Sequence, residues 1–289
     1  MTLIVGATGM LGGEICRLLT ERKKPIRALV RTTSSPDKIA RLKDLGVDIA
    51  FGDLKDRSSL DAACRGVGAV VTTASSTISR QEGDSIESVD RQGQLDLIAA
   101  AERAGVARFV LISFPASDPD YPLQAAKRAA EDRLRQSRLS YTILQPTFFM
   151  EVWLSPHLGF DPVNGTVKIY GSGENKISWI SFQDVARFAV EVLDNPAAAH
   201  ATIELGGPDA LSPIEVVRLA EQALGRTIAV QHVPEEALRA QHSQAPDSMS
   251  QTFAGLMLYY ANGDVIDMTG TLQKLPVGAL KSVRTHFQA

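Results

Sequence analysis

The segment that decides the fold is Leu3-Ile4-Val5-Gly6-Ala7-Thr8-Gly9-Met10-Leu11-Gly12-Gly13, an apolar run that ends in glycines spaced Gly-x-x-Gly-x-x-Gly. An amphipathic segment follows at once, so the context is strand, turn and helix. Glycines at these positions let the backbone approach a pyrophosphate, and the free N–H groups of a helix N-terminus attract its charge. The segment therefore favours a dinucleotide-binding site over a plain tight turn, with these candidate residues: Gly6, Thr8, Gly9, Met10, Leu11 and Gly12.

The length and the net charge of the chain limit the classes of protein to which it can belong. The chain has 289 residues, 44% of them hydrophobic, and a formal net charge of −3 without any basic run. This length suits one large α/β domain, or one domain with a small lobe. Because no basic footprint is present, we expect no nucleic acid and no membrane among the partners, and we expect a small-molecule ligand.

The cysteines, the histidines and the first residues of the chain limit the possible classes of protein further. Cys16 and Cys64 fall in or near expected helices, so reduced buried thiols are favoured over a disulfide. The five histidines show no ligand spacing, and we expect no metal site. The chain opens on an expected strand, with no signal peptide and no apolar run long enough to span a bilayer. We therefore expect a cytoplasmic protein.

Apolar runs and helical patterns alternate along the first half of the chain. The expected helices cover residues 12–20, 36–45, 59–64, 84–104 and 122–135. Alternation of this kind predicts an α/β fold, a doubly wound parallel Rossmann sheet with right-handed crossovers. The expected strands are 3–5, 26–30, 47–50, 69–72, 109–112 and 141–144.

The regular alternation of expected strands and helices ends at Pro146. An apolar insertion over residues 148–153 is followed by short expected strands at 167–170 and 176–180 and by a helix at 181–193. A strand at 202–205, a helix opened by Ser212 and a strand at 228–232 precede further helices. We predict a cofactor-binding domain over residues 1–146 and a smaller mixed substrate lobe over 147–289, intertwined with the first domain.

Several blocks of sequence together carry a resemblance. They are GATGMLG at 6–12, VR at 30–31, GDL at 52–54, AGVARFV at 104–110, YTILQP at 141–146, SFQDVA at 181–186 and ELGGP at 204–208. These blocks resemble the NmrA-like, or atypical short-chain dehydrogenase/reductase, family. The resemblance implies a Rossmann domain with a C-terminal substrate lobe and the use of NADP. Members of that family include quinone reductases, triphenylmethane-dye reductases, isoflavone-type reductases and non-catalytic redox-sensing regulators.

The end of the second strand indicates which nicotinamide cofactor is bound. An NAD site places an acidic residue there for the ribose hydroxyls, whereas this chain has Arg31, which suits the 2′-phosphate of NADP. Lys38, with Thr32 and Ser34, adds possible donors, and the alternative is a solvated surface arginine. Asp53 resembles the family position beside the adenine and equally fits a simple turn or helix-cap aspartate.

The usual short-chain dehydrogenase triad is not present in the sequence. That machinery needs a tyrosine and a lysine one helical turn apart, but Leu123 stands four residues before Lys127. Tyr121 is six residues away, which places it on another face of a continuous helix. Ser113 is followed by Phe114, where the extended enzymes carry hydroxyl residues. A standard carbonyl-reducing triad is therefore not expected.

Lys127 is the candidate catalytic residue that remains. In isoflavone-reductase-like relatives the lysine at this position is catalytic, and elsewhere it binds the nicotinamide ribose. The alternative is a solvent-facing lysine paired with Glu131. Further expected cofactor-binding residues are Ala74, Ser75, Pro146 and Phe148. The expected substrate-binding residues are Phe114, Phe148, Met150 and Trp153, although the aromatic residues also suit simple packing.

Two functions from different classes follow. The first is an NADPH-dependent reductase that delivers hydride to a planar apolar acceptor, such as a quinone, a conjugated cation or an activated alkene, because such acceptors spread the incoming charge. The second is a non-catalytic protein that senses NADP(H) and binds a partner. The sequence leaves the identity of the acceptor and the oligomeric state open.

Overall fold

The computed structural model describes residues 1–78 and 80–288, and the chain divides into two compact units. Unit 1 comprises Met1–Ser113, Ala125–Gln145 and Val185–Ile203, and unit 2 comprises Phe114–Gln124, Pro146–Asp184 and Glu204–Ala289. The segments interleave along the chain, because residues 185–203 return to unit 1. Pro146 begins the second segment of unit 2.

Unit 1 is built on a seven-stranded sheet with the order β10-β6-β5-β4-β1-β2-β3. All the pairs from β6 to β3 are parallel, which confirms the predicted doubly wound α/β class. Strand order reverses between β1 and β4, and ligands of such sheets bind beyond the strand carboxyl ends at that point. The strands are β1 (Thr2–Val5), β2 (Ile26–Val30), β3 (Asp48–Phe51), β4 (Ala69–Thr72), β5 (Arg108–Ile112), β6 (Ser140–Pro146) and β10 (Ala201–Leu205).

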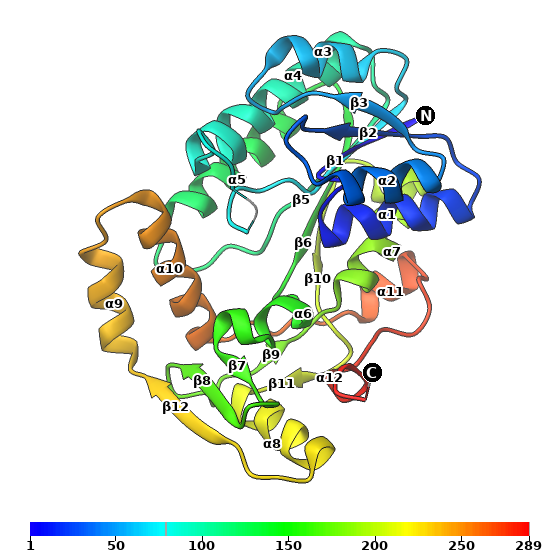
Figure 1. Ribbon diagram of the computed structural model, residues 1–289. Helices are drawn as coiled ribbons and strands as arrows, with labels where there is room; N and C mark the ends of the chain where they lie inside the picture. The colour runs from blue at the N-terminus through cyan, green and yellow to red at the C-terminus, as the bar shows by residue number, and fades with distance from the viewer. Residues whose placement is uncertain (79, 289) are drawn as a thin grey trace. The chain divides into compact units, whose positions relative to one another are not determined.

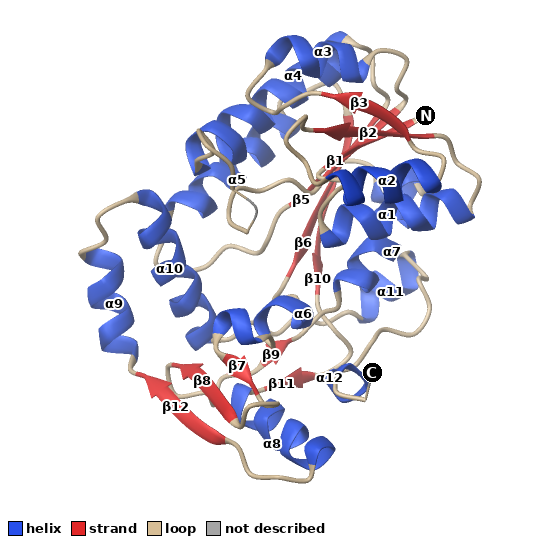
Figure 2. Cartoon of the chain, in the orientation of Figure 1, coloured by secondary structure: helices blue, strands red, loops and turns tan. Residues whose placement is uncertain are grey.

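Helices cover both faces of this sheet. Figures 1 and 2 show α1, α2 and α7 on one side and α3, α4 and α5 on the other. A π-helical stretch, η1 (Ile86–Gly93), runs directly into α4. The helices are α1 (Met10–Glu21), α2 (Pro36–Asp44), α3 (Arg57–Cys64), α4 (Gln94–Arg103), α5 (Pro122–Arg135) and α7 (Phe182–Asp194), with a 3-10 turn, η3, at Pro196–Ala198.

The core of unit 1 lies between the sheet and the second helical layer. Leu3 and Phe109 of the sheet pack with Leu60, Leu97 and Leu134 of the helices, and each of these side chains is fully buried. Burial of one such side chain contributes about 1.5–3 kcal/mol. This packing fixes the strand ends from which the candidate site residues extend.

Unit 2 is a mixed α/β lobe. Its strands are β7 (Phe160–Asp161), β8 (Thr166–Tyr170) and β12 (Ala229–Val233) in one sheet, and β9 (Ile177–Ser178) paired with β11 (Ala210–Leu211) in another. Its helices are α6 (Met150–Trp153), η2 (Pro156–Leu158), α8 (Pro213–Leu224), α9 (Glu235–Ser243), α10 (Ser248–Asn262), α11 (Thr269–Lys274) and α12 (Val283–His286). Ser212 and Glu215 form a reciprocal capping box that begins α8, as the Ser-Pro-Ile-Glu run predicts.

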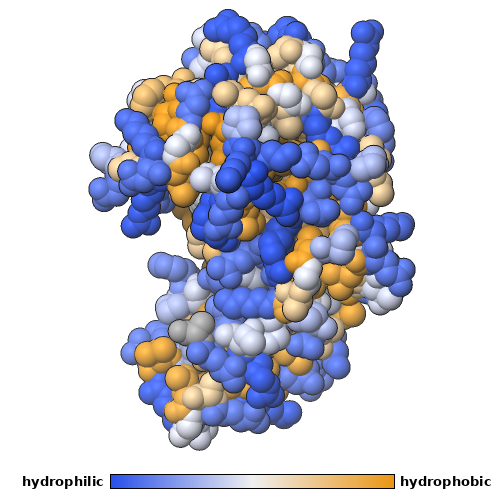
Figure 3. Space-filling view, turned by 90° about the vertical axis from the view of Figure 1, so that its right-hand side faces the viewer, coloured by the Kyte–Doolittle hydropathy of each residue, from blue (hydrophilic) through white to orange (hydrophobic). Residues whose placement is uncertain are grey.

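Figure 3 shows one face of the molecule, on which hydrophilic residues predominate and are interrupted by smaller apolar patches. Within the described part of the chain, no helix combines the length and hydropathy needed to cross a membrane.

Candidate cofactor-binding and active site

The glycine-rich turn joins β1 to α1 by close backbone contacts. Gly6 has a φ of 90°, and a Cβ atom at this residue would lie 2.5 Å from the Oγ1 atom of Thr73. At Gly12 a Cβ atom would lie only 2.2 Å from the carbonyl oxygen of Gly6. The first and third glycines of the motif are therefore required by a left-handed turn and by the approach of the helix to that turn.

The N-terminus of α1 has the properties of an anion-binding site. Gly9 is its N-cap, no side chain caps it, and its first turn holds no acidic residue. Met10 is half exposed, whereas Leu11 is buried and anchors the helix. The first-turn N–H groups and the positive end of the helix dipole are thus available to a pyrophosphate. This fits the dinucleotide cofactor that the sequence predicts.

The segment that follows β4 lies beside the glycine-rich turn. Thr73 donates from its backbone nitrogen to the Val5 carbonyl oxygen, so Ala74 and Ser75 come directly after a strand that neighbours β1. Buried Gln94 of α4 fixes this segment, since its Nε2 atom donates to the Ala74 carbonyl oxygen at 3.3 Å. Ala74 and Ser75 are partly exposed at the sheet edge where the strand order reverses.

Arg31 follows β2 and forms an ion pair that sequence patterns did not predict. Its Nη1 atom lies 2.6 Å from an Oδ2 atom of Asp84, whose side chain is only 1% exposed. Lys38 is exposed on α2, near the same strand end in sequence. Asp53 accepts a hydrogen bond from the Lys55 backbone nitrogen at 2.9 Å, as a turn aspartate does. Asp56, and not Asp53, caps α3.

Lys127 is buried in unit 1, with 6% of its surface exposed. Its Nζ atom donates to the Ile112 carbonyl oxygen, at the end of β5, over 3.3 Å. The ion-pair partners of Glu131 among the described residues are Arg128 and Arg135. A solvent-facing lysine paired with Glu131, the alternative to a functional role, is therefore excluded by the structure.

Asp90 of η1 is a second buried charged group near Lys127. Its Oδ2 atom accepts hydrogen bonds from the backbone nitrogen and the Oγ atom of Ser76, at 3.0 and 2.6 Å. Its Oδ1 atom is buried and has no hydrogen-bond partner in the described structure. Burial lowers the pKa of Lys127, while the carboxylates of Asp90 and Glu131 oppose this shift and Arg128 adds to it.

Ser113 belongs to a buried hydrogen-bond network around Glu131. Its Oγ atom donates to Glu131 at 2.6 Å, and Gln145 Nε2 donates to the same carboxylate at 2.9 Å. Arg128 and Arg135 contact Glu131 as well. The Ser113 hydroxyl is thus directed to a buried carboxylate, and the absence of a catalytic serine stays a prediction.

Tyr121 and Phe114 pack together in unit 2. Their rings stack with centroids 6.0 Å apart and an interplanar angle of 11°, and Tyr121 is 2% exposed. Gly255 of α10 permits this packing, because a Cβ atom there would lie 2.5 Å from the Tyr121 ring. Tyr121 directly precedes α5, outside the helix that carries Lys127.

The aromatic insertion after Pro146 forms part of the unit 2 core. Phe148 and Met150 are 3% and 0% exposed, and Trp153 is partly buried. The Phe148 ring lies 4.8 Å from that of Trp153 and 4.5 Å from that of Tyr259. Pro146 is also buried, at the end of β6. Packing accounts for Phe148 and Met150 in this structure, so contact between them and a ligand stays a prediction.

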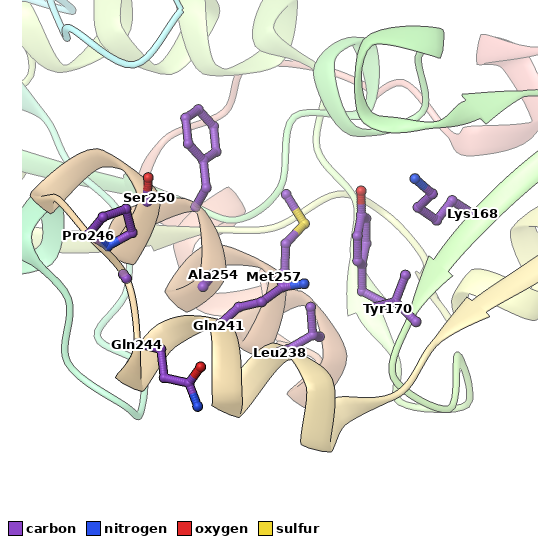
Figure 4. A pocket seen from close by; sticks show the side chains of 12 residues that line it. Lys168, Tyr170, Leu238, Gln241, Gln244, Pro246, Ser250, Ala254 and Met257 are labelled. Atoms are coloured by element: carbon purple, nitrogen blue, oxygen red, sulfur yellow. The ribbon is translucent and has the colours of Figure 1, made fainter.

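Unit 2 contains a cavity of about 600 Å³ that the sequence did not indicate. Figure 4 shows Tyr170 from β8 and Met257 from α10 directed into the same space, with Leu238 and Gln241 from α9 beside them. Lys168 lies at its border. The lining combines an aromatic ring, aliphatic side chains and a few polar groups, which suits a small organic molecule.

Comparison with known proteins identifies the family of this fold and site. The NmrA-like family matches residues 1–276. The chain belongs to the NmrA-like family. The predicted resemblance is thereby confirmed.

The chain is similar to two proteins with different names and roles. The NAD(P)H azoreductase of Xenophilus azovorans is 32% identical over 293 residues, covering 100% of this chain and 96% of the relative. The photosystem II assembly factor Ycf39 of Synechocystis sp. is 32% identical over 244 residues, covering 83% of this chain and 73% of the relative. The fold matches the NADPH-dependent quinone oxidoreductase of Escherichia coli, solved with NADPH, with a TM-score of 0.80 and 23% identity over 100% and 99% of the two chains.

Sequence reasoning missed Asp84 and Asp90 for different reasons. Asp84 lies 53 residues from Arg31, and no local pattern joins the two. Asp90 was detectable from the sequence, because the α-helical spacing expected over residues 84–104 places it on one face with apolar Ile86 and Leu97. A charged residue on an otherwise apolar helix face indicates a buried polar role.

Proposed function

We propose that this chain is a reductase that uses NADPH to reduce a planar, apolar acceptor, such as a quinone, a conjugated cation or an activated alkene. The observation that carries the proposal is the buried Nζ atom of Lys127 without a phenol one helical turn before it, where buried Leu123 stands. Such a site suits acceptors that need little proton donation during hydride transfer.

The general part of this assignment rests on the family. At that level the chain is an NAD(P)H-dependent oxidoreductase of the NmrA-like, atypical short-chain dehydrogenase type, as predicted. NADP as the cofactor is likewise supported by the glycine-rich turn and by the basic residue after β2. A cytoplasmic location stays a prediction.

The residues of unit 1 have separate tasks in this proposal. The first-turn amides of α1, from Met10 to Gly12, hold the pyrophosphate, and Arg31 with Lys38 holds the 2′-phosphate. Asp53, Ala74 and Ser75 line the adenosine and ribose end. When bound, NADPH supplies the hydride that the acceptor receives.

Lys127 holds the nicotinamide ribose in this proposal. A protonated Nζ atom has three donors, and the Ile112 carbonyl oxygen accepts one of them. The remaining donors suit ribose hydroxyl groups, and the open Oδ1 atom of Asp90 suits a hydroxyl donor. Reduction of a quinone or an activated alkene also consumes one proton, which reaches the acceptor from Lys127 or from water. Hydride addition to a conjugated cation gives a neutral product and consumes no proton.

Unit 2 supplies the acceptor-binding surface. The cavity beside Tyr170, Phe253 and Met257 has a lining suited to a flat apolar molecule. Phe114 and Trp153, which are partly exposed, are further candidates from the sequence. Phe148 and Met150 support these surfaces from the core.

A panel of acceptors tests the reductase proposal. NADPH oxidation is followed by its near-ultraviolet absorbance with quinones, triphenylmethane dyes, azo dyes and enones, against reactions that lack the protein. Turnover of one class supports the proposal and names the acceptor. Tight NADPH binding without turnover of any acceptor contradicts the reductase proposal and favours the non-catalytic sensing role. The similarity to an assembly factor is the observation in favour of that second role.

A further inference from the structure

Two cations share one buried carboxylate at the adenosine end of the candidate cofactor site. The Nη1 atom of Arg31 lies 2.6 Å from Asp84 Oδ2, and the Nζ atom of Lys55 lies 2.5 Å from Asp84 Oδ1. The three residues come from loops that follow β2, β3 and β4. They are far apart in sequence and all belong to unit 1.

The backbone around Asp84 fixes its carboxylate. The backbone nitrogen of Gln81 donates to Asp84 Oδ2 at 2.9 Å, and Lys55 Nζ donates to the Glu82 carbonyl oxygen at 3.3 Å. Gln81 also bonds to Thr33, two residues after Arg31. Burial raises the pKa of Asp84, but the hydrogen bonds from Lys55, Gln81 and Arg31 outweigh it and hold the pKa below its usual value.

Arg31 keeps part of its donor edge open. Within residues 1–78 and 80–288, its side chain makes one hydrogen bond, from Nη1, and a quarter of the side chain is exposed. The Nε and Nη2 atoms therefore remain for a ligand. A guanidinium edge of this kind suits the paired oxygens of a phosphate.

Lys55 changes the net charge around Arg31 and Asp84. A buried carboxylate 2.6 Å from Arg31 cancels the positive charge that should attract a 2′-phosphate. Lys55 supplies a second positive charge on the opposite carboxylate oxygen, so the three side chains together carry one net positive charge. Asp53 is 3.9 Å from Lys55 Nζ and is a weaker partner.

We propose that Lys55 determines the preference for NADPH over NADH by neutralising Asp84, which leaves the charge of Arg31 for the 2′-phosphate. Asp84 acts as a positioning residue that orients the guanidinium. Lys55 acts through Asp84 and is a positioning residue too. This inference rests on the proposed use of NADPH, and it does not depend on which acceptor is reduced.

Binding measurements without any acceptor test the inference. Dissociation constants for NADPH and NADH are obtained from the fluorescence of the reduced nicotinamide. Lys55→Met should weaken NADPH binding by about tenfold and leave NADH binding unchanged, because only NADPH carries the 2′-phosphate. Lys43→Met, at an exposed lysine of α2, is the matched control and should change neither constant.

The double variant Lys55→Met/Asp84→Asn distinguishes the mechanism. Removal of the carboxylate should restore NADPH binding to within about twofold of the parent protein, since nothing then cancels Arg31. A double variant as weak as Lys55→Met would show that Lys55 contacts the phosphate directly, and it would overturn the inference. Equal weakening of NADH and NADPH by Lys55→Met would mean a structural role and would overturn it as well. Absence of turnover on every acceptor would affect the proposed function alone.

Discussion

The backbone at Gly12 is so close to Gly6 that a Cβ atom on Gly12 would lie 2.2 Å from the Gly6 carbonyl oxygen. Gly12→Ala should therefore displace α1 and its first-turn amides, and weaken NADPH binding by at least about tenfold. Nicotinamide fluorescence titration measures the change. Gly13→Ala is the control on the same helix, because its Cβ atom would lie 3.4 Å from Ala7, an ordinary contact. Unchanged binding by Gly12→Ala would contradict the proposed pyrophosphate site.

Asp90→Asn should alter the pH dependence of turnover. Burial already lowers the pKa of Lys127, and the carboxylates of Asp90 and Glu131 oppose this effect, while Arg128 adds to it. Loss of the Asp90 charge lowers that pKa further, so the protonated lysine disappears at a lower pH. The alkaline limb of kcat/KM for NADPH should shift to lower pH. Asp96→Asn, at a partly exposed carboxylate of α4, should leave the profile in place.

Lys127→Met should reduce turnover by about 100-fold for each folded molecule, because the ribose loses its ammonium partner and the acceptor a proton source. Circular dichroism establishes that the variant is folded.

Tyr121→Phe should leave turnover within about twofold of the parent, since the tyrosine lies outside α5 and is buried in unit 2. If Tyr121→Phe abolishes turnover while NADPH still binds, the tyrosine-independent mechanism has to be abandoned.

Glu131→Gln should lower the free energy of unfolding by about 2 kcal/mol, because two partly exposed arginines would lose their buried anion. Urea denaturation measures this change. Asp132→Asn, an exposed neighbour, should stay within about 0.5 kcal/mol of the parent.

Ser113→Ala should keep the turnover of the parent protein, since the Ser113 hydroxyl donates to Glu131. Loss of turnover in a stable Ser113→Ala protein would show that Ser113 is catalytic.

The strands of the large sheet were predicted closely because local signals define them. The expected strands from residues 3–5 to 141–144 agree with β1 to β6 within about two residues, since each apolar run ends at glycine, proline or polar residues. The strand at 202–205 was also expected, but its partner was not. Pairing with β6 depends on contacts between segments distant in sequence, and no local pattern specifies it.

The candidate site was predicted in part. The glycine-rich turn was recognisable because its spacing has a direct physical reason, and the close contacts at Gly6 and Gly12 agree with that reason. The burial of Lys127 was not recognisable, because a lysine in a polar helix usually faces solvent. Arg31 was singled out without its partner Asp84, since a buried ion pair across 53 residues leaves no trace in either segment.

The two units are built from six alternating segments of the chain. A single recombination event between two related genes exchanges everything on one side of a breakpoint, so it could not transfer either unit intact. Substitutions and local insertions within its own segments are the changes that alter unit 2 and leave unit 1 intact. Under the proposed function, a new acceptor preference would therefore arise from such changes between residues 114 and 124, 146 and 184, and 204 and 289.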